Sequence, residues 1–231
     1  MSIKGDKMLL EDLRKDSEIK NMLTRAETQL EVMGYTEHSY RHINIVCNRL
    51  EKILRAVGAS EKEIEIGKIA GYLHDIGNCV NRKDHSHSGA ILAYFLLTKK
   101  GMSFLDAAEV MQAIGNHDEE TGQVSTVISA ALILADKSDV HRSRVRRLKV
   151  DKNGLLDKND IHDRVNYAVV KSDLLVDKDN KKIKFVFEID KTICSPMDYF
   201  EIFLDRMKMC RVASAYLGYD FQLLINSFEL A

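Results

Sequence analysis

The sequence predicts a mainly α protein: an all-helical body followed by a small C-terminal α+β appendage of about three antiparallel strands and one helix. Three observations support this fold class. Only one proline and 12 glycines occur in 231 residues, which favours long helices. Apolar side chains recur at helical spacing through most of the first 150 residues. After a polar stretch at 151–159, β-branched and alternating patterns replace the helical one.

The body is expected to contain six helices, each with local signals at its ends. Gly58 should end the second helix, and the pair Ser60 and Glu63 forms the capping box of the third. Ser103 is a suitable N-cap for the fifth. The last helix is apolar at first and basic afterwards. The expected ranges are 9–33, 37–57, 60–74, 86–99, 103–117 and 124–148.

The appendage is expected to begin with two strands, at 165–176 and 183–189, joined by a turn at 177–181. Ser195 and Pro196 then mark the start of a helix that ends before Gly218, and a last strand follows at 221–230. We therefore divide the chain into a helical domain at 1–150 and a small α+β domain at 151–231. The second domain would serve as a dimerisation or lid element.

Charge and composition exclude several classes of protein. The 34 basic and 35 acidic residues give a net charge of −1, which argues against a nucleic-acid partner. No segment approaches the ~18 apolar residues that span a bilayer, and residues 1–7 carry no signal-peptide pattern. The four cysteines are scattered, as is typical of reduced thiols. The sequence thus predicts a cytoplasmic protein without a membrane partner.

Histidines concentrate in the middle of the body, where six of the eight occur: His38, His42, His74, His85, His87 and His117. The dipeptide His74-Asp75 ends an apolar helix, and Asp136 follows an apolar run at 130–135. A buried carboxylate is costly unless a cation compensates it. A metal ion would do so, since imidazoles and carboxylates are common metal ligands.

The order His42, His74-Asp75, Asp136 resembles that of the HD superfamily of metal-dependent phosphohydrolases. Residues 71–77 resemble its LLHDIG segment, and 85–90 and 117–122 are similar to the HPxxGAxI and HHExxDG segments of its HD-GYP branch. The resemblance covers about residues 38–147. Asn116 and the sequence at 122–124 differ from that branch, so the chain lacks its Gly-Tyr-Pro signature.

The resemblance implies a binuclear metal centre in which Asp75 bridges two ions. His42 rather than His38 is the first ligand, because only its distance to Gly58 and His74 fits the family. The cofactors would be divalent first-row transition metal ions, with Fe or Mn expected first and Zn, Ni or Co as alternatives. The implied ligands are His42, His74, Asp75, His85, His117 and Asp136.

The resemblance further implies hydrolysis of a phosphate ester or anhydride, with a nucleotide as the expected substrate. His74 and Asp75 would generate hydroxide at the metals, and Asp118 is a candidate proton donor within an otherwise solvated loop at 118–120. The expected substrate contacts are His38, Arg82, Lys137, Arg142 and Arg144.

Two other functions use the same residues. The ligand order also resembles the mixed-valent di-iron oxygenases of the superfamily, which would need iron and dioxygen. The second alternative is a non-catalytic domain that binds a nucleotide and signals through the appendage. A homodimer would be compatible with each, because the edges of a small sheet can pair with a second copy.

Overall fold

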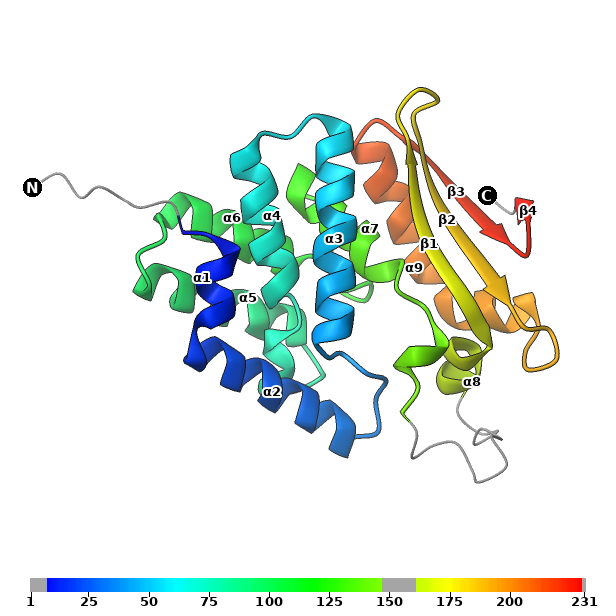
Figure 1. Cartoon of the computed structure of the whole chain (residues 1–231), viewed down its shortest axis with the longest axis horizontal. Helices are drawn as coiled ribbons and strands as arrows, with labels where there is room; N and C mark the ends of the chain where they lie inside the picture. Colours follow the sequence, from blue (N-terminus) through cyan, green and yellow to red (C-terminus); the bar gives the residue numbers. More distant parts are fainter. Residues whose placement is uncertain (1–7, 147–160, 230–231) are drawn as a thin grey trace, which may run out of the picture.

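The computed structural model describes residues 8–146 and 161–229, and within them it confirms the predicted fold class (Figure 1). The helices of the body are α1 (Leu10–Lys15), α2 (Ser17–Val32), α3 (Tyr40–Val57), α4 (Glu61–Leu73), α5 (His85–Lys99), α6 (Phe104–Gly115) and α7 (Val127–Lys137), with 3-10 turns η1 (Ile76–Cys79) and η2 (Arg142–Arg144). The appendage contains α8 (Ile161–Ala168), β1 (Val169–Asp177), β2 (Lys182–Ile189), α9 (Pro196–Tyr216), β3 (Asp220–Ile225) and β4 (Phe228–Glu229).

Local signals place most helix ends correctly. Gly58 adopts a left-handed conformation (φ 82°) at the end of α3, and Ser60 forms the predicted capping box with Glu63 at the start of α4. The expected helix at 9–33 is instead two helices. Asp16 separates them, because its carboxylate accepts a hydrogen bond from the Ile19 amide (3.0 Å) and caps α2.

The prediction of one long helix at 124–148 is wrong. Helix α7 ends at Lys137, and the Ser138 hydroxyl donates to the Ala135 carbonyl (2.7 Å), which competes with helical pairing at this point. The chain then turns into η2, where Arg144 donates to the Asp139 carbonyl (2.8 Å). Residues 147–148 of the expected helix lie outside the described residues.

The sheet has the order β1-β2-β3-β4 and is mixed, whereas three antiparallel strands were predicted. Strands β1 and β2 form an antiparallel hairpin, and β3 and β4 form another. Between them, β2 and β3 are parallel, because α9 carries the chain back along the sheet before β3 begins. Strand β1 starts at Val169, since α8 occupies the first residues of the expected strand. The predicted domain boundary at 151–159 lies outside the described residues.

Helix α9 lies between the sheet and the body (Figure 1). Its Tyr199 ring is 5.5 Å from the Phe187 ring of β2, and Phe203, Met207 and Cys210 are also buried. On its other side α9 packs against α7, which carries Asp136. One continuous apolar core therefore runs from the helices into the sheet.

The outer edge of β1 is covered by side chains of the body. Arg49 donates to the Ser172 carbonyl, Lys52 to the Leu174 carbonyl (2.7 Å) and His141 to the Val170 carbonyl (3.1 Å). These bonds satisfy carbonyls that would otherwise be available to another strand. A dimer formed by pairing at this edge is therefore not favoured.

Two findings concern the predicted environment of the chain. All four cysteines are free, in agreement with reduced thiols. Among the helices that the structure describes, none combines the length and apolar character needed to cross a membrane.

Candidate metal centre

The end of α4 brings the His74-Asp75 pair to the centre of the molecule. His74 is fully buried, and its Nδ1 donates to the Gly71 carbonyl (2.8 Å) one turn earlier. Asp75 leaves the helix and precedes η1, where Asn78 Nδ2 donates to its Oδ1 (3.0 Å). Asn78 therefore orients the carboxylate of Asp75.

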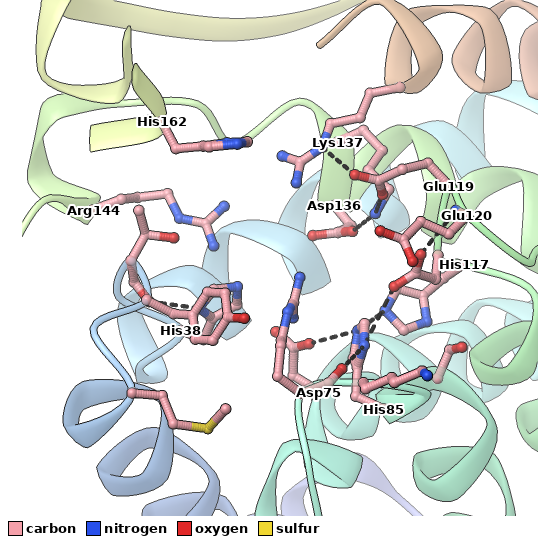
Figure 2. A pocket seen from close by; sticks show the side chains of 18 of the residues that line it. His38, Asp75, His85, His117, Glu119, Glu120, Asp136, Lys137, Arg144 and His162 are labelled. Atoms are coloured by element: carbon pink, nitrogen blue, oxygen red, sulfur yellow. Dashed lines mark hydrogen bonds and ion pairs between the residues drawn. The ribbon is translucent and has the colours of Figure 1, made fainter. Parts of the chain in front are cut away.

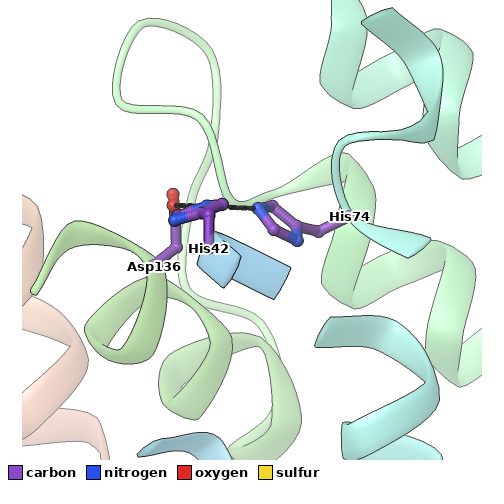
Figure 3. A group of neighbouring side chains, drawn as sticks. All are labelled: His42, His74 and Asp136. Carbon is purple, nitrogen blue, oxygen red and sulfur yellow. Dashed lines mark hydrogen bonds and ion pairs between the residues drawn. The ribbon is translucent and has the colours of Figure 1, made fainter. Parts of the chain in front are cut away.

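Two other helices supply the remaining members of the first half of the centre (Figure 3). His42 Nε2, from α3, lies 3.3 Å from His74 Nε2 and 3.3 Å from Asp136 Oδ1 on α7. Asp75 Oδ2 is 3.8 Å from the same His42 nitrogen. These atoms converge on one point, so His42, His74 and Asp136 can hold a metal ion.

The second half of the centre is built where α5 begins and where α6 ends. His85 Nε2 lies 3.2 Å from His117 Nε2 and 3.6 Å from Asp75 Oδ1. His74, Asp75 and His117 form a second group close enough to hold a metal ion, so His74 is common to both groups. The structure thus brings all six predicted ligands together.

Two glycines allow this approach of α5 to η1. A Cβ on Gly77 would lie 1.9 Å from the His85 carbonyl oxygen and 2.5 Å from the Gly89 amide nitrogen. Backbone atoms cannot move aside as a flexible side chain does. Gly77 therefore keeps His85 within reach of Asp75.

The hydrogen bonds of the imidazoles determine which ring nitrogen carries the proton. His74 and His117 direct Nδ1 at the carbonyls of Gly71 and Ile114 (2.8 and 2.6 Å), and His85 does so at Arg82 (3.1 Å). His42 Nδ1 lies 2.8 Å from the Asp139 carboxylate. Because these oxygens only accept, each Nδ1 is protonated, and in the neutral imidazole the Nε2 presents a lone pair.

The Nε2 atoms of these histidines face each other. In the pairs His42–His74 and His85–His117 the two Nε2 atoms are 3.3 and 3.2 Å apart. Asp75 Oδ2 is also buried without a hydrogen-bond partner. Such a cluster of electron pairs and carboxylates is repulsive unless a cation lies among them. The residues therefore fit divalent metal ions.

The ionisation of the cluster agrees with a cation site. Burial raises the pKa of Asp75, but His74 and His38 outweigh this effect and hold that pKa well below its usual range. Burial lowers the pKa of His117 to about 3, and His85 and His74 add to the shift. The carboxylate is thus charged and His117 neutral at pH 7, which are the forms that bind metals.

A cavity of about 710 Å³ opens above the centre and is lined by the body and the appendage (Figure 2). Asp75, Asp136 and His85 line it, and α8 and α9 contribute His162 and Arg206. Four of the predicted substrate contacts line the cavity: His38, Arg82, Lys137 and Arg144. The predicted proton donor, Asp118, lines it as well. The appendage is therefore part of the cavity wall.

Arg142 does not line the cavity, in contrast to the prediction. Its guanidinium lies over the Tyr167 ring at 5.2 Å from the ring centroid. The prediction assumed that Arg142 continued the helix of Asp136. Because α7 ends at Lys137, Arg144 instead faces the cavity.

Three charged residues of the site carry no motif and were not predicted. Asp139 accepts from His42 Nδ1 and thereby orients this imidazole; its position one turn after Asp136 was the available signal. Glu119 was expected in a solvated loop. It is instead 2.6 Å from Lys137 Nζ and 2.5 Å from Arg206 Nε. Nothing in the sequence near Arg206 indicates that it reaches the cavity.

Comparisons with known proteins add a relative and a solved structure. No protein-family model matches the chain. The uncharacterized protein MJ1020 of Methanocaldococcus jannaschii is 28% identical over 163 residues, which cover 61% of this chain and 62% of that protein. The chain thus matches less than two thirds of this relative's length.

Among solved structures, the chain is similar to a predicted HD superfamily hydrolase from an uncultured Thermotogales bacterium. The two share 25% identity over 58% of this chain and 75% of the other, with a TM-score of 0.42. The motifs of the sequence, and the buried cluster of histidines and aspartates that they form, give this chain its resemblance to the HD superfamily of metal-dependent phosphohydrolases.

Proposed function

We propose that the protein is a metal-dependent phosphohydrolase that cleaves a phosphate ester or anhydride. The observation that carries this proposal is the convergence of four Nε2 lone pairs on the carboxylates of Asp75 and Asp136. His42, His74 and Asp136 would hold one ion, and Asp75, His85 and His117 the other. Metal ions bound there would supply the chemistry that lowers the pKa of a bound water, so that hydroxide would be available near neutral pH.

The residues of the chain itself would bind the substrate and move protons. Lys137 and Arg144 line the cavity beside the ligands and would neutralise a phosphoryl group. Asp118 also lines the cavity, and its Oδ2 is 3.3 Å from His85 Nδ1. We propose Asp118, from this position on the cavity wall, as the proton donor to the leaving group.

A nucleotide is the substrate we expect. The cavity of about 710 Å³ lies within the range of small-molecule sites, roughly 300–1,000 Å³. Tyr35 lines it beside Arg82, whose guanidinium lies 5.6 Å from the centroid of that ring. The aromatic ring could stack on the base of a nucleotide, and the guanidinium could bind its phosphates.

The test begins with the metal content of protein purified without added metal or chelator. We expect two first-row ions per chain by elemental analysis, and turnover of p-nitrophenyl phosphate or of one member of a nucleotide panel. His74→Ala should abolish metal binding and turnover together. His87→Ala is the matched control, because His87 is exposed on the helix that carries His85.

Other results would change the proposal. One ion per chain would make His85 and His117 substrate contacts of a mononuclear enzyme. Iron with oxygen consumption on a diol would favour the oxygenase. Protein that stays free of metal after soaking in Mn²⁺ and Fe²⁺, or a metal-loaded His74→Ala variant with full turnover, would refute it.

A further inference from the structure

We propose that Arg206, on the appendage helix α9, binds a phosphate group of the substrate, and that Glu119 occupies this position until the phosphate displaces it. This inference rests on the proposed function and adds a specificity-determining residue to the same site. It also gives the appendage a direct part in substrate recognition.

Two contacts hold the Arg206 guanidinium at the cavity. Its Nε lies 2.5 Å from Glu119 Oε1, and its central carbon is 4.7 Å from the centroid of the Phe203 ring. Within the described residues, the two terminal nitrogens donate to no protein acceptor. The side chain stays 22% exposed and lines the cavity, so these nitrogens can meet a ligand there.

Glu119 joins Arg206 to the metal centre. Its other oxygen, Oε2, lies 2.6 Å from Lys137 Nζ, and that nitrogen is 2.9 Å from Asp136 Oδ2. One carboxylate thus bridges two cations next to a proposed metal ligand. A phosphate group offers the same oxygen acceptors to a guanidinium and an ammonium group, with more charge.

The Glu119 carboxylate competes with an anionic ligand, because it already accepts from the Lys137 ammonium group and from the Arg206 guanidinium. Arg144 and His162 lie across the cavity from Glu119 (Figure 2). A phosphate between the two sides would contact cations from the body and from the appendage.

Inorganic phosphate, titrated calorimetrically into the Mn²⁺-loaded full-length protein, tests the inference. We expect Arg206→Gln to weaken phosphate binding by at least about tenfold, the effect of one charge-assisted bond. Arg206→Lys should weaken it less, because charge remains but the planar fork is lost. Arg211→Gln, at an exposed arginine of the same helix, is the control and should bind as the wild type does.

Glu119→Gln separates a ligand-binding role from a structural one. If Glu119 competes with phosphate, its neutral variant should bind phosphate several-fold more tightly. If the Glu119–Arg206 pair only stabilises the fold, both variants lower the melting temperature without opposite changes in affinity, and the inference is wrong. If Arg206→Gln does not fold, Arg206→Lys and Glu119→Gln decide the question.

The outcomes also distinguish this inference from the proposed function. Wild-type and Arg206→Gln proteins that bind phosphate equally well and both hydrolyse p-nitrophenyl phosphate would overturn the role of Arg206 and leave the phosphohydrolase intact. Wild-type protein that takes up metal but binds no phosphate and hydrolyses no phosphate ester would overturn both.

Discussion

Each proposed metal-binding imidazole is oriented by a second residue. For three of the histidines this residue is a carbonyl acceptor three positions earlier in the chain, whereas His42 depends on Asp139, which is 97 positions away in the chain. Asp139 also accepts from Arg41 (3.2 Å) and is almost completely buried. This carboxylate, which was not predicted, therefore fixes the tautomer of the first predicted ligand.

Asp139→Ala should weaken metal binding by roughly 10–100-fold, because His42 loses the acceptor that fixes its tautomer and orientation. Competition between the protein and a coloured chelator for Mn²⁺ or Zn²⁺ measures this change. Asp173→Ala, at an exposed aspartate of β1, should bind metal as the wild type does. Equal affinity in all three proteins would show that Asp139 does not support the site.

The pKa of His117 predicts how the stability of the metal-free protein depends on pH. Burial lowers this pKa to about 3, whereas an unfolded histidine titrates near 6.5. Between these values the unfolded chain binds a proton that the folded chain does not. The free energy of unfolding should therefore fall with decreasing pH, by up to about 1.4 kcal/mol per pH unit from this group.

Urea unfolding in EDTA at pH 7, 6 and 5 can isolate this contribution, if the wild type is compared with His117→Gln. The pKa of His74 shifts upward: burial lowers it, but Asp75 and Asp136 outweigh that effect. The contribution of His74 therefore has the opposite sign and is common to both proteins. The variant should lose less stability on acidification, and parallel curves for the two proteins would contradict the prediction.

At the scale of elements, the site depends on how helix ends meet. Helix α4 ends at Leu73, just before His74, α5 begins at His85 and α6 ends shortly before His117, so three termini bring candidate ligands together. The close contact of η1 with the start of α5 requires glycine at position 77. This contact holds the two halves of the centre together.

Gly77→Ala should separate His85 from Asp75 and remove at least one metal ion per chain, while the helical content stays unchanged. The added Cβ would overlap the His85 carbonyl oxygen, which belongs to the backbone of α5. Elemental analysis and circular dichroism measure the two quantities. Gly115→Ala is the control, because its Cβ would meet only Ala90 at 3.5 Å, an ordinary contact. A Gly77→Ala protein with full metal content would refute this role of the glycine.

At the scale of the whole molecule, the appendage and the body form one structure around the cavity. Helix α9 packs against both α7 and the sheet, and side chains of α3 bind the carbonyls along the edge of β1. The cavity lies where these parts meet. A ligand or metal bound there should therefore stabilise the entire fold.

Removal of metal should lower the melting temperature of the protein. Metal at 100 times its dissociation constant stabilises the folded state by about 2.7 kcal/mol, which corresponds to roughly 5–10 °C for a chain of this length. Differential scanning calorimetry with and without EDTA, followed by Mn²⁺ addition, measures the shift. His74→Ala should show no shift on Mn²⁺ addition, and an equal shift in both proteins would place the metal elsewhere.

The sequence by itself determined the fold class, most helix boundaries and the candidate ligands from His42 to Asp136, which the structure brings together. These features follow from local periodicity, capping residues and short motifs, which are visible within a few turns of chain. The end of α7 was missed, because a hydroxyl and a buried arginine ended a helix whose basic continuation still looked helical.

Only the tertiary structure decided which charged residues reach the cavity. It excluded Arg142, and it brought Glu119 together with Arg206 across 87 positions of sequence. It likewise made β3 parallel to β2, through the return path of α9. Such contacts join segments that are far apart in the sequence, and no local motif or periodicity predicts them. They form because α9 packs between the sheet and the body.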